Sequence, residues 1–344
     1  MKRALELALK NSQGARPNPS VGAVIVSENR VIGEGFTSNY GGNHAEINAL
    51  NQIRKEDLPV LSKAILYVTL EPCSHTGKTP PCSLAIIQSG IPKVVIGCKD
   101  PNPLVSGKGI TLLKASNIEV TTGVLEKECA EAHRQFLTFI NHKRPYITLK
   151  WAASKDEFIA PLKDQQSKPG SYWLSHPLSK QWTHKLRANS MGIVIGAETL
   201  RYDRPSLNTR IWAGKDPEIL IIGGKLSDIP RDWLNKQVSI TQFTKTPEKR
   251  SLGIYQIAIE DSRETINSLV NHCIEYQIQT LLVEGGSQVI NQFLECNLWD
   301  ETIIFKCNSN LKEGVKAPRI DQKPLKIMNS AGDKVIIHRN RAKQ

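Results

Sequence analysis

The hydrophobic positions of the chain predict two successive series of buried strands and amphipathic helices. In the first series, apolar runs with β-branched members, typical of buried strands, occupy residues 21–27, 64–70 and 93–98. Helical spacing of apolar residues predicts helices over residues 1–9, 45–53, 83–89, 107–116 and 125–142, around a short strand near Ile118. This alternation predicts one sheet with helices on both faces, a three-layer α/β/α domain.

A polar segment that ends in proline, Asn141-His142-Lys143-Arg144-Pro145, separates the two series. Beyond it, buried-strand runs occupy residues 146–152, 191–196, 218–222 and 280–283. Helical spacing recurs at residues 179–189, 262–276 and 287–296. The length of 344 residues also fits about two domains. We therefore expect two α/β domains, residues 1–143 and 144–344.

The net charge of +12 raises the question of a nucleic-acid partner. Residues 1–144 carry +5 and the remainder +7, so the excess is spread over both halves and forms no basic tail or stripe. A nucleic-acid site is normally concentrated, whereas a diffuse positive field favours encounter with a small anion. The sequence thus predicts an anionic small-molecule substrate and no nucleic-acid partner.

The apolar runs and the cysteines give no indication of a membrane or of an oxidising compartment. No apolar run approaches the roughly 20 residues of a membrane span. The charged, amphipathic N-terminal segment lacks the apolar core of a signal peptide. Seven cysteines is an odd number for a disulfide framework. We expect a cytoplasmic protein with no membrane partner.

The strongest chemical signal is His44-Ala45-Glu46 followed by Pro72-Cys73 and Pro81-Cys82. One histidine and two cysteines are ligands that zinc prefers, and three protein ligands leave a fourth position open for water, as in catalytic zinc sites. Glu46 is the right type of residue to carry protons to and from that water. The pattern H-x-E…P-C-x-x-C is typical of zinc deaminases, although eight residues separate the two cysteines here.

The local context supports a metal site. The strand at 64–70 ends at Glu71-Pro72-Cys73, and Pro81 precedes the helix at 83–89. Each thiol is therefore expected at or near a helix N-terminus, where the helix dipole favours the thiolate form. Two alternatives stay open: a closed structural zinc site with His75 as the fourth ligand, or two buried free cysteines.

Two segments of the second domain indicate ligand binding. Glu284-Gly285-Gly286-Ser287 joins a buried strand to a helix, so that backbone N–H groups can approach a phosphate at the start of the helix. Residues 199–210 form a polar and basic segment directly after another strand. No G-x-G-x-x-G follows the first strand, so a Rossmann fingerprint is absent.

Together these motifs resemble the bifunctional riboflavin-biosynthesis family that joins a pyrimidine deaminase to a reductase. The resemblance is carried by the segments 17–22, 44–46, 69–82 and 100–109, and the eight-residue gap between the cysteines is this family's own spacing. It covers almost all of the first domain. It implies a cytidine-deaminase-like first domain and a dihydrofolate-reductase-like second domain, with Zn²⁺ and NADPH as cofactors.

For the first domain, the resemblance implies deamination of 2,5-diamino-6-ribosylamino-4(3H)-pyrimidinone 5′-phosphate. His44, Cys73 and Cys82 would hold the zinc and Glu46 would be catalytic. The implied substrate-binding residues are Asn18, His75, Lys78, Asp100 and Asn102.

For the second domain, the resemblance implies NADPH-dependent reduction of the ribosyl group of 5-amino-6-(5-phosphoribosylamino)uracil to ribityl. The implied substrate-binding residues are Lys150, Ser171, Arg187, Leu207, Arg210 and Glu284. The implied cofactor-binding residues are Ala152, Trp173, Thr199, Asp203, Gly286 and Ser287. The family would also imply a homo-oligomer, a dimer or a tetramer.

The second domain departs from the family pattern in two places. Glu157 and Phe158 stand where the family usually has glycine and a basic or polar residue. The segment 161–170 is longer than the corresponding segment of the family. Three other readings stay open: a deaminase of tRNA or free cytidine, a zinc-stabilised RNA-binding module without catalysis, and a chain whose reductase has decayed. The first would show two residues between the cysteines and a focused basic face, which this sequence lacks.

Overall fold

The computed structural model describes residues 1–344 except 77–79, 104, 163–171, 235–238, 249–252 and 341–344. The chain divides into two compact units, Met1–Lys143 and Arg144–Gln344. Within the described part of the chain, no helix combines the length and the apolar character needed to cross a bilayer.

The first unit is built on a five-stranded sheet in the order β2-β1-β3-β4-β5. β1 pairs antiparallel with β2 and β3, whereas β3, β4 and β5 run parallel. The strands span Gly22–Ser27 (β1), Arg30–Phe36 (β2), Ile65–Leu70 (β3), Lys93–Cys98 (β4) and Glu119–Thr122 (β5). The helices span Lys2–Ala8 (α1), Ala45–Asn51 (α2), Cys82–Ser89 (α3), Lys108–Ala115 (α4), Glu126–Ala132 (α5) and Arg134–His142 (α6), with a 3-10 helix at Lys55–Lys63 (η1).

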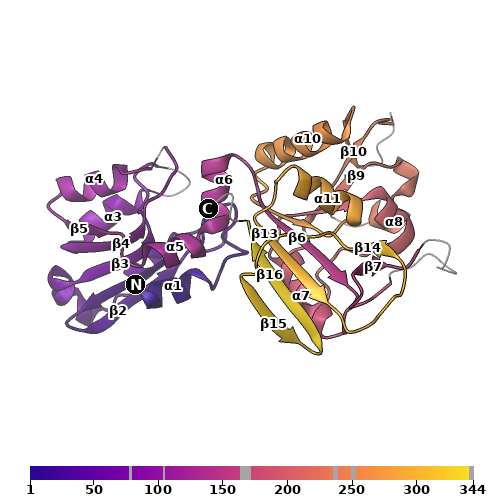
Figure 1. Ribbon diagram of the computed structural model, residues 1–344. Helices are drawn as coiled ribbons and strands as arrows, with labels where there is room; N and C mark the ends of the chain where they lie inside the picture. Colours follow the sequence, from indigo (N-terminus) through magenta and orange to yellow (C-terminus); the bar gives the residue numbers. More distant parts are fainter. Residues whose placement is uncertain (77–79, 104, 163–171, 235–238, 249–252, 341–344) are drawn as a thin grey trace. The chain divides into compact units, whose positions relative to one another are not determined.

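Helices cover both faces of this sheet (Figure 1). On one face, α2, α3 and α4 contribute buried side chains such as Ala49, Ile86 and Leu113 to the main apolar core. On the other face, Ala4 and Leu7 of α1 pack against Val24 of β1. Because successive side chains of a strand point to opposite faces, the apolar runs of β1, β3 and β4 fill both layers. The predicted three-layer arrangement is confirmed.

Two glycines let α2 pack closely on the sheet. A Cβ atom at Gly33 would lie 2.4 Å from the Ala49 carbonyl oxygen, and one at Gly35 would lie 2.2 Å from that of Ala45. A larger residue at either position would push α2 outward. Since His44 is the residue before α2 and Glu46 lies in its first turn, this close approach fixes both motif residues against the sheet.

The second unit is built on a nine-stranded sheet in the order β11-β10-β9-β8-β12-β6-β13-β16-β15. The first seven strands in this order, from β11 through to β13, run parallel to one another. The last two, β16 and β15, are antiparallel to their neighbours. The strands of the sheet span Tyr146–Ala153 (β6), Gly192–Gly196 (β8), Glu218–Ile222 (β9), Ile240–Thr244 (β10), Tyr255–Ala258 (β11), Thr280–Val283 (β12), Glu301–Lys306 (β13), Lys326–Ser330 (β15) and Asp333–Arg339 (β16). A separate two-stranded sheet pairs Phe158–Ala160 (β7) with Val315–Lys316 (β14).

Helices again lie on both faces of this sheet (Figure 1). They span Ser179–Ala188 (α7), Ala197–Asp203 (α8), Arg231–Leu234 (α9), Ser262–Glu275 (α10) and Ser287–Glu295 (α11), with a 3-10 helix at Leu226–Asp228 (η3). One core joins α10 and α11 to the sheet through side chains such as Leu269 and Phe293. A second core, which includes Leu200 of α8 and Trp233 of α9, joins these two helices to the sheet.

One predicted helix is interrupted in the structure. Residues 125–142 form two helices, α5 and α6, because the backbone at His133 has φ −97° and ψ 6°. The His133 ring is buried, and its Nε2 lies 3.0 Å from the Thr69 hydroxyl of β3. Burial lowers the pKa of His133 to about 4. A buried polar group needs a partner, and the neutral ring finds it on the sheet at the point where the helix is interrupted.

Candidate active sites

Three elements of the first unit bring the predicted metal ligands together. His44 precedes α2, Cys73 follows β3, and Cys82 is the first residue of α3. His44 Nδ1 lies 3.6 Å from Cys73 Sγ and 3.3 Å from Cys82 Sγ. Their ligand atoms all lie within 4.8 Å of one another. Two sulfur donors and one imidazole nitrogen in such a cluster fit a tetrahedral zinc with one open position.

Both thiols lie at or near the start of a helix, as expected. Cys82 begins α3, whereas Cys73 lies in the loop after β3 and begins no helix. Cys73 nevertheless meets the start of α3, because the Cys82 backbone N–H donates to its sulfur at 3.3 Å. Hydrogen bonding from the Cys82 thiol, followed by that from His44, lowers the pKa of Cys73, which favours the thiolate that binds metal.

Glu46 faces the same cluster from the first turn of α2. Its side chain is buried, with 3% of the residue exposed. Burial, followed by the charge of Cys73, raises the pKa of Glu46 to about 7. A carboxyl group that gains and loses a proton near neutrality is suited to general acid–base chemistry.

A cavity of about 250 Å³ opens beside the cluster. Its wall contains His44, Glu46 and Cys73, together with the predicted substrate-binding residues Asn18, His75, Asp100 and Asn102. Lys78 lies outside the described residues. His75 is exposed and is not among the clustered metal ligands, so the geometry does not favour the closed site with His75 as fourth ligand.

The same cavity wall includes residues that the sequence analysis missed. Tyr40, Gly41 and Gly42 contribute from the loop before α2, and Phe136 contributes from α6. Glu71, the residue before Pro72, lines it as well. The adjacent glycines in a polar loop beside the His44 motif were a usable signal, whereas Phe136 has no local sign of its role.

In the second unit, a cavity of about 580 Å³ lies at the carboxyl ends of parallel strands β6, β8, β9 and β12. Ligands of open α/β sheets bind at this edge. Most of the predicted substrate and cofactor residues line the cavity: Lys150, Ala152, Trp173, Arg187, Thr199, Asp203, Leu207, Glu284, Gly286 and Ser287. Ser171 lies outside the described residues.

A buried ion pair lies on the wall of this cavity. Arg187 of α7 binds Glu284 with both ends of its guanidinium, Nε to Oε1 at 2.8 Å and Nη2 to Oε2 at 2.9 Å. Its Nη1 donates to the Asn208 carbonyl at 3.2 Å. Burial would raise the pKa of Glu284, but Arg187 and then Lys150 lower it, so Glu284 is an anion at neutral pH. Burial lowers the pKa of Lys150, which interacts electrostatically with both members of the pair.

In the glycine loop after β12, residues 284–287, two polar groups already form hydrogen bonds within the protein. The Gly286 N–H donates to the Thr199 hydroxyl at 2.9 Å, and the Ser287 hydroxyl donates to the Lys316 carbonyl at 3.1 Å. A Cβ atom at Gly286 would lie 3.0 Å from the Thr199 hydroxyl oxygen, so the glycine permits this contact. The loop and α8 are therefore held together on the wall of the cavity.

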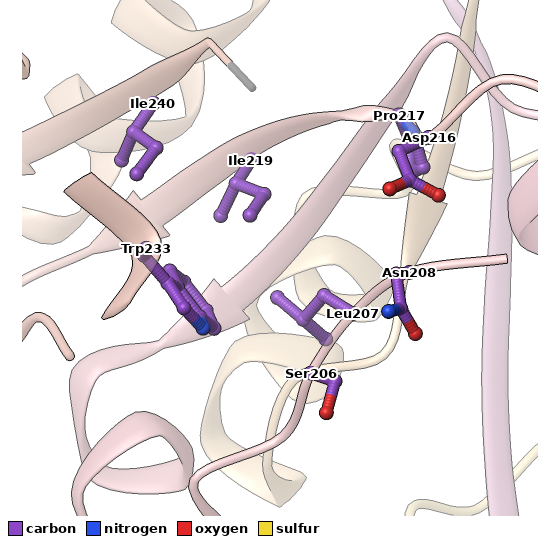
Figure 2. Close-up of a pocket in the computed structure, with 8 residues that line it drawn as sticks. All are labelled: Ser206, Leu207, Asn208, Asp216, Pro217, Ile219, Trp233 and Ile240. Atoms are coloured by element: carbon purple, nitrogen blue, oxygen red, sulfur yellow. The ribbon is translucent and has the colours of Figure 1, made fainter. Parts of the chain in front are cut away.

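Arg210 lies outside the cavity wall, and Leu207 lines both this cavity and a second, small pocket. Arg210 is exposed, is absent from the cavity wall and donates to the Asn208 side chain at 2.8 Å. Leu207 is buried between the large cavity and a small pocket of about 10 Å³, where Figure 2 shows it beside Ile219 and Trp233. That pocket holds no more than about one water molecule, so it is a packing defect and not a ligand site.

Comparison with known proteins identifies both units. Residues 1–98 match the cytidine and deoxycytidylate deaminase zinc-binding region, and residues 145–307 match the RibD C-terminal domain. The riboflavin biosynthesis protein RibD of Aquifex aeolicus (strain VF5) is 36% identical over 92% of this chain and 88% of its own length. RibD of Escherichia coli (strain K12) is 32% identical over 89% of this chain and 86% of its own.

The chain belongs to the RibD family of riboflavin biosynthesis proteins.

Solved structures agree with this family assignment. A diaminohydroxyphosphoribosylaminopyrimidine deaminase/5-amino-6-(5-phosphoribosylamino)uracil reductase from Thermotoga maritima superposes with a TM-score of 0.86 at 33% identity, covering 98% of this chain and 97% of that one. RibD of Acinetobacter baumannii superposes with a TM-score of 0.85 at 30% identity, covering 98% and 96%.

Membership of the RibD family establishes the general activity. The chain is a bifunctional enzyme of riboflavin biosynthesis, with a cytidine-deaminase-like first domain and a reductase second domain. Its cofactors are zinc, for which His44, Cys73 and Cys82 are the candidate ligands, and NADPH in the reductase domain. The expectations of fold, family and enzyme class are confirmed, and the RNA-binding module without catalysis is excluded.

Proposed function

We propose that residues 1–143 deaminate 2,5-diamino-6-ribosylamino-4(3H)-pyrimidinone 5′-phosphate. We propose that residues 144–344 then reduce the ribosyl group of 5-amino-6-(5-phosphoribosylamino)uracil to ribityl with NADPH. The substrate names printed for the Thermotoga maritima relative support this pair of reactions. The diffuse charge of +12 suits phosphorylated substrates.

In the first reaction, bound zinc supplies a water whose pKa is lowered toward neutrality. His44, Cys73 and Cys82 would hold the metal, and His44 and Cys73 line the same cavity as Glu46. Glu46 would take one proton of the attacking water and pass it to the ring nitrogen as the C–O bond forms. It would then take the second proton, from the new hydroxyl, and pass it to the amine, which leaves as ammonia when the C–N bond breaks. Its burial between the ligands and the cavity supports this role.

The remaining wall of the first cavity binds the substrate. Asn18 hydrogen-bonds the ring or the ribose. His75, Asp100 and Asn102, which gather on the wall of the same cavity, position the ribose phosphate together with Lys78. A lysine ammonium serves phosphate as a compact point charge.

In the second reaction, the C1′–O4′ bond of the ribosyl group would open to an imine or an equivalent form, with a proton taken up by O4′, and NADPH would supply a hydride to C1′. Lys150 and Glu284 contact the reacting end of the substrate, and Thr199 and Asp203 face the nicotinamide side. Ala152, Trp173, Gly286 and Ser287 hold the cofactor, while Ser171, Leu207, Arg187 and Arg210 bind the substrate. Because the guanidinium of Arg187 is already bound to Glu284, the exposed Arg210 is the freer of the two arginines to meet a phosphate.

The observation that carries the deaminase proposal is the cluster of His44, Cys73 and Cys82 beside buried Glu46. Glu46→Gln removes the proton carrier without removing a metal ligand. We expect this variant to retain zinc and to release ammonia from the diaminopyrimidine phosphate at least about 100-fold more slowly. Metal content and ammonia release, measured on the same preparations, check this. Full turnover by the zinc-loaded variant would exclude Glu46 as the proton carrier.

The reductase proposal has its own assay. Wild-type protein mixed with 5-amino-6-(5-phosphoribosylamino)uracil and NADPH should consume the reduced cofactor, followed by its absorbance. The Glu46→Gln variant should consume it at the wild-type rate, since Glu46 belongs to the other unit. No consumption by either protein would exclude this reductase activity and leave deamination standing.

We propose further that the enzyme works in the cytoplasm as a homo-oligomer, a dimer or a tetramer, on small molecules and without nucleic-acid or membrane partners. Exposed apolar side chains on the edge strand β15 and just before it, Ile327 and Leu325, support self-association. Sedimentation of the purified protein tests the oligomeric state, and a monomer at micromolar concentration would contradict it.

A further inference from the structure

Glu71 is a buried carboxylate for which the proposed mechanism has no role. It directly follows β3, two residues before Cys73, and only 4% of the residue is exposed. Its carboxylate accepts three backbone N–H groups: Oε2 from Asp100 at 3.4 Å and from Gly107 at 3.1 Å, and Oε1 from Ile110 at 3.3 Å. An ionised carboxylate has only acceptor sites, so three converging donors match it.

All three donors belong to one segment, the chain between β4 and the first turn of α4. That segment carries Asp100 and Asn102, both on the wall of the first cavity. The Asp100 side chain accepts the Asn102 N–H at 2.8 Å and closes a tight turn between them. Because Glu71 holds the segment at the backbone of Asp100, it fixes the starting point of this turn.

Glycine allows the segment to come close to the ligand loop. A Cβ atom at Gly109 would lie 2.1 Å from the Pro72 carbonyl oxygen, a distance that real Cβ atoms do not reach. Pro72 is the residue between Glu71 and Cys73. The loop that holds a metal ligand and the segment that carries two cavity side chains are therefore in direct contact, both through Glu71 and through Gly109.

We propose that Glu71 is a positioning residue for deamination: it holds Asp100 and Asn102 at a set distance from Cys73 and so determines how well the phosphorylated substrate binds. This inference rests on the proposed function, because it takes Asp100 and Asn102 as substrate contacts. A residue that only stabilised the core would leave substrate affinity untouched once the variant was folded and loaded with metal.

Glu71→Gln is the direct test, because glutamine keeps the shape but replaces one acceptor oxygen with an NH₂ donor. We expect zinc to be retained, KM for the diaminopyrimidine phosphate to rise about tenfold or more, and kcat to stay within about threefold, the pattern of lost binding. The exposed Glu128 of α5 offers the matched control, and Glu128→Gln should leave both constants unchanged.

Gly109→Ala gives a second route to the same displacement. Its Cβ atom pushes the segment from the Pro72 carbonyl oxygen and would lie 3.3 Å from Glu71 Oε1, while the Glu71 carboxylate stays chemically unchanged. It too should raise KM with zinc retained. Combining both substitutions should raise KM by less than the product of the two single effects, because both act on one contact. If Glu71→Gln fails to fold, Gly109→Ala decides the matter alone.

The outcomes separate this inference from the proposed function. Zinc-loaded Glu71→Gln or Gly109→Ala with a wild-type KM would overturn the positioning role while wild-type deamination stands. A fall in kcat in proportion to lost zinc, with KM unchanged, would likewise overturn it and leave Glu71 as support for the metal site. A wild-type protein that releases no ammonia would instead refute the deaminase proposal itself.

Discussion

Glu157 occupies a backbone conformation that ordinarily favours glycine. Its φ is +68°, in the left-handed region, within the turn between β6 and β7. Its side chain forms an ion pair with Lys306 and is mostly exposed. It is not part of the described wall of the large cavity. The departure from the family pattern at this position therefore concerns backbone strain and does not obstruct the reductase site.

Glycine and alanine at position 157 should separate the strain from the ion pair. Both Glu157→Gly and Glu157→Ala lose the contact with Lys306, which as an exposed pair is worth at most about 1 kcal/mol. Only alanine keeps the left-handed strain, of about 1–2 kcal/mol. We expect Glu157→Gly to be more stable than Glu157→Ala by about 1 kcal/mol, measured by denaturant unfolding of the second unit. NADPH consumption should be unchanged in both, and a large loss would show that Glu157 takes part in reduction.

Asp203 lies on the cavity wall, and its burial there lowers the stability of the folded protein near neutral pH. Burial raises its pKa to about 6, so the folded protein binds this proton more tightly than the unfolded chain does. The folded state then loses stability as pH rises from about 4 to 6, and the ionised carboxylate is a net cost at pH 7. Such a cost is common where a residue is kept for function.

Asp203→Asn should therefore stabilise the second unit at pH 7 and have no effect near pH 4, while slowing NADPH consumption. Asp156→Asn is the control of opposite sign. The Ser154 hydroxyl, and after it the Leu311 and Lys312 N–H groups, lower the pKa of Asp156 to about 2. The stability that the Asp156 carboxylate contributes is present above about pH 4 and is lost as the pH falls toward about 2. Thermal midpoints at both pH values check the pair, and a lower midpoint for Asp203→Asn at pH 7 would contradict the argument.

At the scale of elements, the Arg187–Glu284 pair joins α7 to the carboxyl end of β12. Both side chains are buried, with 5% and 9% exposed. A buried pair contributes little net stability over a well-packed apolar pair, but losing one partner leaves an uncompensated charge. The pair therefore holds this part of the cavity wall in one arrangement, with Lys150 as a third titratable group on the same wall.

Arg187→Met should destabilise the second unit by about 3–5 kcal/mol, because Glu284 would stay buried without its main partner. Adding Glu284→Gln should recover part of that loss, since the remaining group is neutral. Arg201→Met, which removes an arginine whose acidic neighbours lie 3.8 Å away, should cost less than about 1 kcal/mol. Urea unfolding of the wild type, Arg187→Met, Glu284→Gln, the double variant and Arg201→Met gives these values. Additive effects of the two substitutions in the double variant would refute the coupling.

The elements also show which parts of the fold the sequence could predict. Strands β4, β9 and β12 match their apolar runs residue for residue, because buried parallel strands leave an unbroken hydrophobic signal. β2 gave no such signal, since its two glycines and its charges serve the packing of α2 and the surface. The antiparallel strands β15 and β16 were missed for a similar reason, as polar residues interrupt them.

In the functional sites too, only features with a local sequence signal could be predicted. The metal cluster was predictable because each ligand carries a local motif, and the resemblance supplied their grouping. The pairing of Arg187 with Glu284 joins residues 97 positions apart, and no local pattern reports it. The hydrogen bonds of Glu71 are of the same kind. Contacts between distant segments depend on the topology of the sheet, which single-sequence periodicity does not determine.

At the scale of the whole molecule, each unit has its own core. The apolar clusters of the first unit contain residues up to Cys129 with Phe136 packed against them, and those of the second begin at Ile147. The metal ligands all belong to the first unit, and the large cavity belongs to the second. The two activities should therefore respond separately to changes in metal.

Removing zinc with a chelator should abolish ammonia release and leave NADPH consumption at its wild-type rate. Zinc held by His44, Cys73 and Cys82 would connect the start of α2, the loop after β3 and the start of α3, so its loss should also lower the unfolding midpoint of the first unit. The midpoint of the second unit should not move. Calorimetry with and without chelator, and with zinc added back, measures both transitions. A fall in both midpoints would mean that the second unit depends on the metal of the first, and the assignment of one independent site to each unit would then be wrong.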